Sequence, residues 1–393
     1  MMRIGIDVRY LSHGLVGGVH TYVRNLVPAL LAAGPEHQFI LYADTKAPFE
    51  LRDLPANTRV RYLPYRNALS SVASDVVRLG RMMSADRVEV AHFPINYGFG
   101  PRGGATVITL HDAMTLMPLS HTLRSKGTRW NTRARAMTIY LYCCSHLALR
   151  RADLVLTVSD HARREIARYS RYDAGRIVPI HHGIDGELRR VTDPVVLAEV
   201  RARYGLERPF ILADGLKNPA VIVRAWQRLP QHLRDSHTIV FFARHEPLPV
   251  VREAEAAGQC RLLLNIPRAD LVALYSMACA FVFPSWLEGF GIPILEAMTC
   301  GAPVICADNS AMPEVAGGAA LLCNAEDDHT LAAHLGRVLG DPNEAGRLRT
   351  LGFARARQFS WQRAAEQTLA AYHRAAGIAV TGTDNRRLQA QQG

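Results

Sequence analysis

Short apolar runs alternate with segments of helical period along the whole chain, and this alternation limits the folds that the sequence can adopt. The runs are rich in Val, Ile, Leu and Phe and show no polar alternation, which is typical of strands covered on both faces. The helical segments between them are long enough to act as crossovers between parallel strands. The sequence therefore predicts an α/β protein built from βαβ units.

The predicted strands fall into two groups. Those of the first half are RIGIDV, QFILYA, VRYLPY, VEVAHF, ATVITL, LVLTV and RIVPIH, and those of the second half are FILAD, TIVFFA, RLLLNI, AFVFP, PVICA and AALLC. A chain of 393 residues is long enough for two domains of ordinary size. We place the boundary near TDPVVLAEV and predict two doubly wound, Rossmann-like domains, residues 1–190 and 191–360, facing each other across a cleft.

The end of the chain is predicted to form three helices, starting near His329, Asn343 and Trp361. The last of these, over about 361–377, is expected to pack back on the first domain. Residues 378–393 are polar with little to bury, so we predict a flexible tail there.

Several features bear on location. No run approaches the roughly 18 apolar residues of a spanning helix, and the first residues, MMRIGIDVRY, do not resemble a signal peptide. The 7 cysteines include no CxxC pair, which indicates reduced core thiols. We therefore expect a cytoplasmic protein.

The net charge of +11 calls for a partner or a location. Between Asp112 and Asp153 there is no acidic residue, and the segment 124–151 is rich in arginine. An anionic membrane at its inner face, or a phosphate-bearing lipid acceptor, would attract such a segment, and so would a nucleic acid. The alternative is a solvated basic face without a partner.

Chemically suggestive residues follow four of the predicted strands. Ligands of open parallel sheets bind beyond the carboxyl ends of the strands. Gly17-Gly18 follows RIGIDV, His111 follows ATVITL, Lys217 follows FILAD, and EGFGIPILEAM follows AFVFP. We expect these groups to lie at the carboxyl edges of the two sheets.

The stretch after AFVFP combines two carboxylates with a helix start. Pro293 suits a first helical position, which places Glu296 in the first turn and Glu288 in the preceding loop. The loop and helix start would offer bare amides to an anion, from Gly289, Phe290, Gly291 and Ile292. Carboxylates beside a phosphate site can accept hydrogen bonds from hydroxyls, so a nucleotide sugar fits. The alternative is that Glu296 only complements the helix dipole and Glu288 is a solvated loop acid.

EGFGIPILEAMTCGAPVI followed by NSAMPEVAGGAALL resembles the signature of glycosyltransferase family 4, the retaining nucleotide-sugar transferases of GT-B fold. The mark of that family is two glutamates separated by seven residues, which Glu288 and Glu296 match. Most of the chain shares the resemblance, through the segments VGGVHTYVRNL, TLHDAM, ADLVLTVSDHARREI, HHGID, LKNP and IPRADLVALYSMACAFVFPS.

The resemblance assigns roles in the second half of the chain. Glu296 matches the glutamate that holds the ribose hydroxyls, and Glu288 the glutamate near the donor sugar and the reacting centre. The amides of residues 290–292 match those that bind donor sugar and diphosphate. Lys217 matches the lysine that neutralises the departing diphosphate.

In the first half, the resemblance implies that His111 faces the donor sugar. It also implies that the loop with Gly17 and Gly18 allows the backbone to approach the diphosphate and the acceptor. A metal site is not expected, because no carboxylate or thiol lies at metal-ligand spacing from His181-His182. A dinucleotide site is not expected either, because GLVGG does not match GxGxxG.

One departure from the family pattern concerns the second diphosphate cation. Family members usually carry an arginine a few residues before the lysine, whereas FILADGLKNP reaches Lys217 without one. Arg244, at the end of the next predicted strand, is the candidate replacement.

The resemblance implies a retaining, metal-independent hexosyltransferase without a cofactor, acting by front-face substitution. We expect it to move a hexose, with mannose as the first choice, from a nucleotide diphosphate sugar to a glycan or lipid-linked glycan in bacterial surface polysaccharide or lipopolysaccharide assembly. One alternative is a non-catalytic GT-B-like binding subunit, supported only by the missing arginine. The other is a nucleic-acid-binding protein, supported only by the charge, and we do not expect it.

Overall fold

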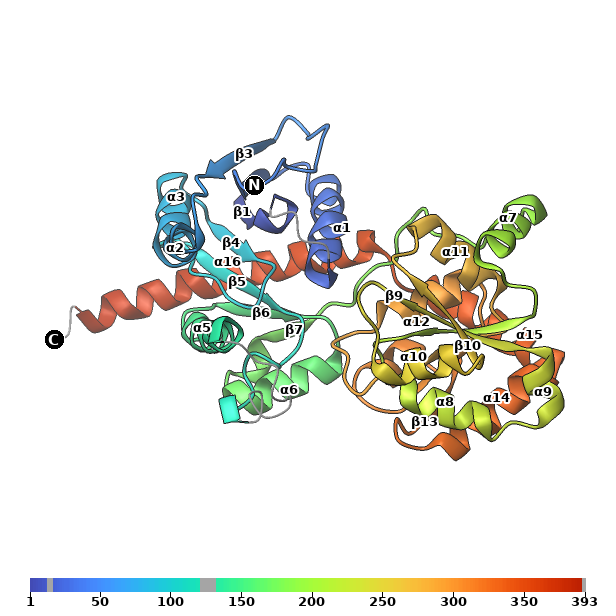
Figure 1. Cartoon of the computed structure of the whole chain (residues 1–393). Coiled ribbons are helices and arrows are strands. Elements are labelled where there is room, and N and C mark those ends of the chain that lie inside the picture. Colours follow the sequence, from blue (N-terminus) through green and yellow to red (C-terminus); the bar gives the residue numbers. More distant parts are fainter. Residues whose placement is uncertain (13–16, 121–131, 391–393) are drawn as a thin grey trace. The chain divides into compact units, whose positions relative to one another are not determined.

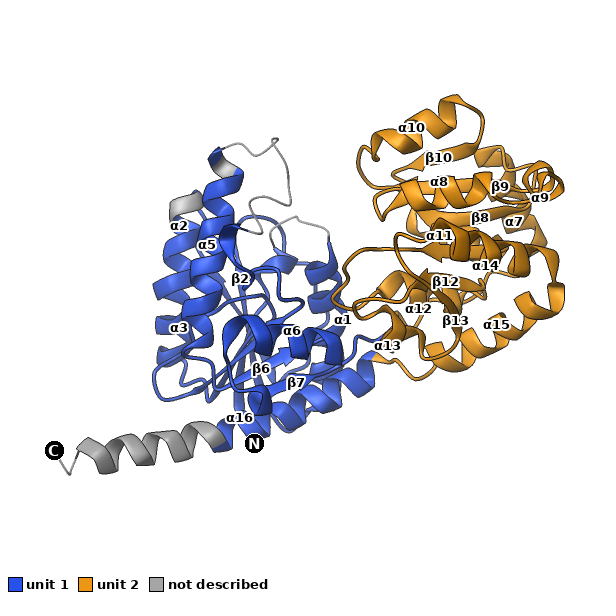
Figure 2. Cartoon of the chain, turned by 90° about the horizontal axis from the view of Figure 1, so that it is seen from below, with its two compact units in different colours: residues 1–183, 361–393 blue, residues 184–360 orange. Residues whose placement is uncertain are grey.

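The computed structural model describes residues 1–12, 17–120 and 132–390, without the side chains of 68, 69, 133 and 378–390. The chain divides into two compact units (Figures 1 and 2). Unit 1 contains residues 1–183 and 361–393, and unit 2 contains residues 184–360. Each unit is an α/β domain with its own parallel sheet.

Unit 1 is built on a seven-stranded parallel sheet with the order β3-β2-β1-β4-β5-β6-β7. Its strands are β1 (Arg3–Asp7), β2 (Gln38–Asp44), β3 (Thr58–Leu63), β4 (Val90–Phe93), β5 (Ala105–Leu110), β6 (Leu154–Thr157) and β7 (Ile177–Pro179). Its described α-helices are α1 (Gly18–Ala33), α2 (Ala68–Ala73), α3 (Leu79–Ala85), α5 (Thr132–Leu149), α6 (Asp160–Ser170) and α16 (Trp361–Ala390), and a π-helical turn η2 (Ser74–Arg78) joins α2 to α3.

The core of unit 1 explains why its strands read as continuous apolar runs. Every residue of β4 and β5 is buried, because helices cover both faces of the sheet. On α1, Tyr22, Leu26 and Leu30 recur at helical spacing and pack against α16, which brings Trp361 and other residues into the same core. Helix α16 thus joins the end of the chain to the first domain.

Unit 2 is built on a six-stranded parallel sheet with the order β10-β9-β8-β11-β12-β13. Its strands are β8 (Phe210–Asp214), β9 (Thr238–Ala243), β10 (Cys260–Leu264), β11 (Ala280–Phe283), β12 (Val304–Ala307) and β13 (Ala320–Cys323). Its α-helices are α7 (Pro194–Tyr204), α8 (Pro219–Gln227), α9 (Gln231–Ser236), α10 (Pro249–Ala256), α11 (Arg268–Met277), α12 (Ile292–Thr299), α13 (Met312–Ala316), α14 (Asp328–Gly340) and α15 (Pro342–Ala356).

The structure confirms the predicted α/β class and a strand at each of the apolar runs. The division differs from the predicted one, since unit 2 begins at Ile184 instead of residue 191. Helix α16 continues to Ala390, past residue 377 where the sequence analysis ended it. The helical backbone therefore takes up most of the segment predicted as a flexible tail, and residues 391–393 lie outside the described part.

A buried charge cluster stands at the end of β1. The guanidinium of Arg9 donates to both carboxylate oxygens of Asp7, at 2.8 and 2.7 Å, and to Asp75 of η2 at 2.5 Å. Tyr97 and Tyr140 donate their hydroxyls to the other oxygen of Asp75, at 3.0 and 2.8 Å. Because Arg9 is only 4% exposed, its charge depends on these partners.

A second buried polar group joins α16 to the sheet. The two ring nitrogens of His92, on β4, lie 2.6 Å from the hydroxyl of Tyr372 and 2.7 Å from that of Thr109. Burial lowers the pKa of His92 to about 3, with a smaller contribution from the charge of His111. His92 is therefore neutral at physiological pH.

This histidine makes the folded protein sensitive to acid. Between its pKa in the unfolded chain, about 6.5, and its value in the folded protein, the unfolded state binds more protons, so stability falls as the pH falls. We expect the Tm to drop between pH 7 and pH 5 in thermal unfolding experiments. His92→Gln keeps a donor and an acceptor but does not titrate, so its Tm should depend less on pH, and an equal dependence would contradict this account.

Candidate active site

The most chemically dense region of unit 2 lies at the carboxyl ends of β8 and β11. The chain order of the sheet reverses at this pair of strands, and ligands of doubly wound sheets bind at such a switch point. Lys217 follows β8 and Glu288 follows β11, and the Lys217 Nζ lies 2.7 Å from the Glu288 Oε1. The structure therefore brings together two of the residues predicted to be catalytic.

The loop that carries Glu288 is held in place by two serines. Ser285 donates its hydroxyl to the Glu288 carboxylate at 2.8 Å. Ser310 accepts from the Glu288 amide at 2.9 Å and donates to the Glu288 carbonyl at 2.5 Å. Asn218, which follows Lys217 in the loop after β8, donates its side-chain amide to the carbonyl of Pro284 at 3.0 Å. This hydrogen bond joins the loop of Lys217 to the loop of Glu288.

Helix α12 begins immediately after this loop. Gly291 has φ of 110°, in the left-handed region that favours glycine, and this turn directs the chain into the helix. Phe290 is buried and packs edge-on against Phe359, with ring centroids 5.9 Å apart. The helix starts at Ile292, so Glu296 lies in its second turn and the predicted position in the first turn was wrong.

Glu296 is paired with a residue that the sequence analysis did not select. The Arg268 Nη2, at the start of α11, lies 2.7 Å from the Glu296 Oε1. Burial opposes the charge of Arg268, but the hydrogen bond and charge of Glu296 outweigh it, and the pKa of Arg268 is raised. The sequence signal that could have found this residue is its position at the start of the helix that follows β10, at the same sheet edge.

Asp214, the last residue of β8, is a further acid at this edge that the sequence analysis missed. Its Oδ1 accepts from the Leu216 amide at 2.8 Å. Burial raises the pKa of Asp214, against the opposing charges of Lys217 and Arg244. Arg244, the candidate second cation, is exposed and follows β9, near enough to act on Asp214.

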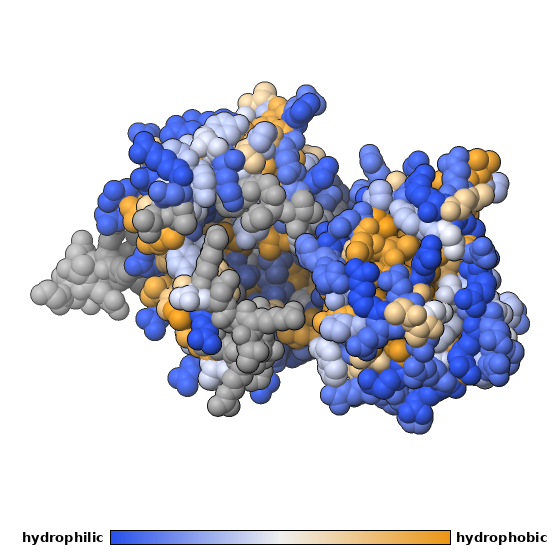
Figure 3. All heavy atoms as spheres, viewed as in Figure 1, coloured by the Kyte–Doolittle hydropathy of each residue, from blue (hydrophilic) through white to orange (hydrophobic). Residues whose placement is uncertain are grey.

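Exposed apolar side chains accompany the charged ones. Five of them follow β8, β9, β10 and β11 or end these strands, at Leu216, Leu248, Leu264, Trp286 and Leu287. Figure 3 shows apolar surface of unit 2 surrounded by hydrophilic surface. Exposed apolar groups around a few fixed charges are typical of ligand sites.

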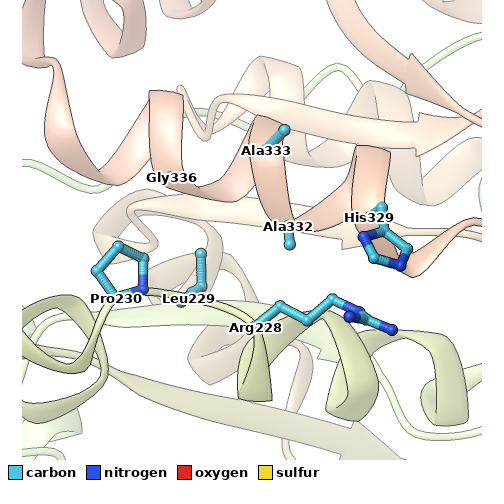
Figure 4. A pocket seen from close by; sticks show the side chains of 7 residues that line it. All are labelled: Arg228, Leu229, Pro230, His329, Ala332, Ala333 and Gly336. Carbon is cyan, nitrogen blue, oxygen red and sulfur yellow. The ribbon is translucent and has the colours of Figure 1, made fainter.

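A separate groove of about 530 Å³ lies between the end of α8 and α14 (Figure 4). It is lined by Arg228, Leu229, Pro230, His329, Ala332, Ala333 and Gly336. None of the predicted site residues lines this groove, so we do not assign it to the candidate active site.

In unit 1, His111 follows β5 and lies among aromatic rings. Its Nε2 lies 3.1 Å from the carbonyl of Pro94, after β4, which indicates that Nε2 carries the proton and leaves Nδ1 as an acceptor. Burial lowers the pKa of His111, although the Pro94 carbonyl and the charge of Asp112 oppose this change. His111 is thus suited to accept a hydrogen bond from a hydroxyl.

Three residues around His111 were missed from the sequence. Tyr22 lies edge-on to His111 with ring centroids 4.8 Å apart, and His182 lies 5.8 Å away on the same measure. The ring of His182 stacks on Trp361, at 5.6 Å. The predicted strand RIVPIH reaches His181, but β7 ends at Pro179, so His182 lies in the loop that follows. The motif HHGID was the available signal.

Gly17 and Gly18 stand at the start of α1, with Gly17 as its N-cap. A Cβ added at either residue would meet no atom of the described residues within 4 Å. Residues 13–16 of this loop, and residues 121–131 of the basic segment, lie outside the described part of the chain.

Metal binding needs a cluster of ligand side chains, and membrane insertion of a helix needs a long apolar segment. No group of three or more His, Cys, Asp or Glu side chains among the described residues could hold a metal ion. None of the helices that the structure describes is long and apolar enough to cross a membrane.

Comparison with known proteins adds to this geometry. Residues 16–188 match the family described as Glycosyltransferase Family 4, and residues 214–354 match the family described as Glycosyl transferases group 1. The chain belongs to glycosyltransferase family 4. The O-antigen chain mannosyltransferase B of Escherichia coli is 35% identical over 243 residues, which is 59% of this chain and 64% of the relative. The match therefore spans less than two thirds of that relative's length.

Solved structures establish the same fold for this family 4 member. Sucrose-phosphate synthase of Thermosynechococcus elongatus has a TM-score of 0.69 and 20% identity, over 95% of this chain and 99% of the synthase. HepE of Anabaena, in complex with UDP and glucose, has a TM-score of 0.65 and 18% identity, over 94% and 98% of the two chains. The predicted GT-B fold, with two Rossmann-like domains, is confirmed.

Proposed function

We propose that this family 4 member is a retaining hexosyltransferase that uses a nucleotide diphosphate sugar. The observation that carries the proposal is the meeting of Lys217 and Glu288 at the switch point of the unit 2 sheet. A cation and a carboxylate on adjacent loops suit a ligand with phosphates next to hydroxyls. HepE, which has the same fold, was solved with UDP and glucose, which supports this class of donor.

Mannose is the proposed sugar, and a glycan or lipid-linked glycan of bacterial surface polysaccharide or lipopolysaccharide is the proposed acceptor. The support is the similarity to a mannosyltransferase of O-antigen chains. Contact with an anionic membrane through the basic segment 124–151 belongs to the same proposal, with the protein at the cytoplasmic face.

In the proposed reaction, unit 2 binds the donor and unit 1 binds the acceptor. Glu296 accepts from the ribose hydroxyls, Glu288 from the sugar, and the amides of residues 289–292 with Lys217 hold the diphosphate. Gly17 and Gly18 leave room for backbone contact, and His111 accepts from a sugar hydroxyl. Arg244, exposed after β9, is the candidate second cation that the sequence pattern suggests.

The proposed chemistry is front-face substitution without a metal or cofactor. The bond from the anomeric carbon to the phosphate oxygen breaks while the bond to the acceptor oxygen forms on the same face. The departing phosphate oxygen takes the proton of the acceptor hydroxyl. Lys217 stabilises the negative charge that develops on the diphosphate. Glu288 positions the sugar and does not attack it.

The test is a transfer assay with labelled GDP-mannose, UDP-glucose and dTDP-rhamnose, with and without EDTA, on a lipid-linked glycan extract. We expect one donor to be used, EDTA to have no effect, and NMR of the product to show the anomeric configuration of the donor. An inverted product, or loss of activity with EDTA, would contradict the mechanism.

The second candidate function is a binding subunit without turnover. It is favoured only by the absence of an arginine in the loop before Lys217. Binding of a nucleotide sugar without transfer to any extract would support this candidate over the transferase. Binding of nucleic acid is not proposed.

A further inference from the structure

Arg268 stands in the proposed donor site, in a segment that shares the family resemblance, and its side chain has had no role so far. Its guanidinium lies 2.7 Å from Glu296, and its side chain is 43% exposed, whereas that of Glu296 is 15% exposed. The arginine is thus the outer partner of the pair, and it lies on the solvent side of a carboxylate that the donor is proposed to reach.

The four charged side chains at this edge form two ion pairs, which a bound donor would have to separate. Lys217 is paired with Glu288 and Arg268 with Glu296, each at 2.7 Å, so the two cations and two carboxylates form two neutral pairs. A diphosphate needs cations, while ribose and hexose hydroxyls need acceptors. A ligand that carries both groups can separate each pair and satisfy all four side chains.

We propose that Arg268 is the second cation for the donor diphosphate, and that it moves there from Glu296 when the ribose hydroxyls bind that carboxylate. This inference rests on the proposed function. A ribose carries its hydroxyls and its α-phosphate on the same ring, so a phosphate next to Glu296 comes within reach of a long, flexible arginine that starts at the same carboxylate.

The same reasoning explains the shortened loop before Lys217. A retaining transferase without metal needs positive charge beside the leaving diphosphate. No arginine stands between β8 and Lys217. Two described arginines follow the neighbouring strands at this edge, Arg244 in the loop after β9 and Arg268 at the start of α11, which follows β10. Of these two, Arg268 is already held against a carboxylate of the site, whereas the charge of Arg244 acts on Asp214, which is not a predicted ligand of the donor.

The test uses calorimetric titration with nucleosides, nucleoside monophosphates and nucleoside diphosphates of guanine, uracil, thymine and adenine. For the base that binds, Arg268→Gln is expected to lower the affinity for the diphosphate about tenfold or more, because charge-assisted bonds to phosphate are lost. Its affinity for the nucleoside should stay equal or rise, because Glu296 no longer has a competing partner. Arg268→Lys should keep most of the diphosphate affinity.

Two further variants serve as controls. Arg203, on α7, pairs with Asp270 at the same distance of 2.7 Å, and its side chain is 53% exposed. It is not one of the proposed donor ligands, so Arg203→Gln should leave all affinities unchanged. Arg244→Gln distinguishes the two candidate cations, and a larger loss there than in Arg268→Gln would overturn the inference. The Tm of each variant checks that it folds.

The outcomes separate this inference from the proposed function. If Arg268→Gln binds the diphosphate as well as the intact protein does, or if it loses nucleoside and diphosphate affinity equally, Arg268 does not bind phosphate and only the inference is wrong. If the intact protein binds no nucleoside diphosphate, the proposed function fails and the inference fails with it.

Discussion

Lys217→Ala is expected to lower kcat about a hundredfold to a thousandfold, since this is the usual effect of removing one group that stabilises a developing oxyanion. The Lys217 Nζ is the described cation that pairs with Glu288 at the switch point, and the amides at the start of α12 carry only partial charge. Without the lysine, its side-chain cation no longer stabilises the negative charge that builds up on the leaving diphosphate as the sugar bond breaks. The KM for the donor should change much less than kcat.

The measurement is steady-state kinetics at saturating acceptor, with Lys217→Arg as the matched control. Arginine keeps the charge but changes the geometry, so this control should retain more activity than the alanine variant. A Lys217→Ala enzyme with normal kcat and a raised donor KM would mean that the lysine contributes only to ground-state binding.

Arg9→Met is expected to lower the free energy of unfolding by about 3–5 kcal/mol, the usual cost of removing one partner from a buried ion pair. Methionine removes the charge that balances Asp7 and Asp75, and both carboxylates are buried. Denaturant unfolding followed by circular dichroism measures this change.

The matched control is Arg59→Met. Arg59 also pairs with a buried aspartate, Asp86, but its side chain is 55% exposed, and Arg61 and Tyr42 remain as partners. Exposed ion pairs contribute about 0–1 kcal/mol, so this variant should be nearly as stable as the intact protein. Equal losses in both variants would contradict the account of the Arg9 cluster.

The fold could be predicted from the sequence because its signals are local. Runs such as ATVITL and AFVFP are buried on both faces, and this leaves an apolar pattern that turns and helices interrupt. The end of α16 could not be predicted in this way. Residues 378–390 are mostly polar in sequence and give no apolar stripe that would predict a helix, yet α16 continues through them.

The site could be predicted in part. Glu288 and Lys217 follow strands that are distant in the sequence, and the rule that strand ends share an edge was enough to place them together. The pairing of Arg268 with Glu296 could not be predicted, because it depends on which arginine of several reaches a given carboxylate. Likewise, Trp361 and His182 stack only because α16 packs on unit 1.

The central claim is that the edge of the unit 2 sheet binds a nucleotide diphosphate sugar, and the most direct measurement is calorimetric titration with GDP, UDP, dTDP and ADP. The account predicts that one of these binds to the intact protein and that Glu296→Ala and Lys217→Ala each lower the affinity at least tenfold, as expected for lost charged hydrogen bonds. Arg203→Gln should bind normally. Binding that survives both substitutions, or no binding of any diphosphate, would contradict it.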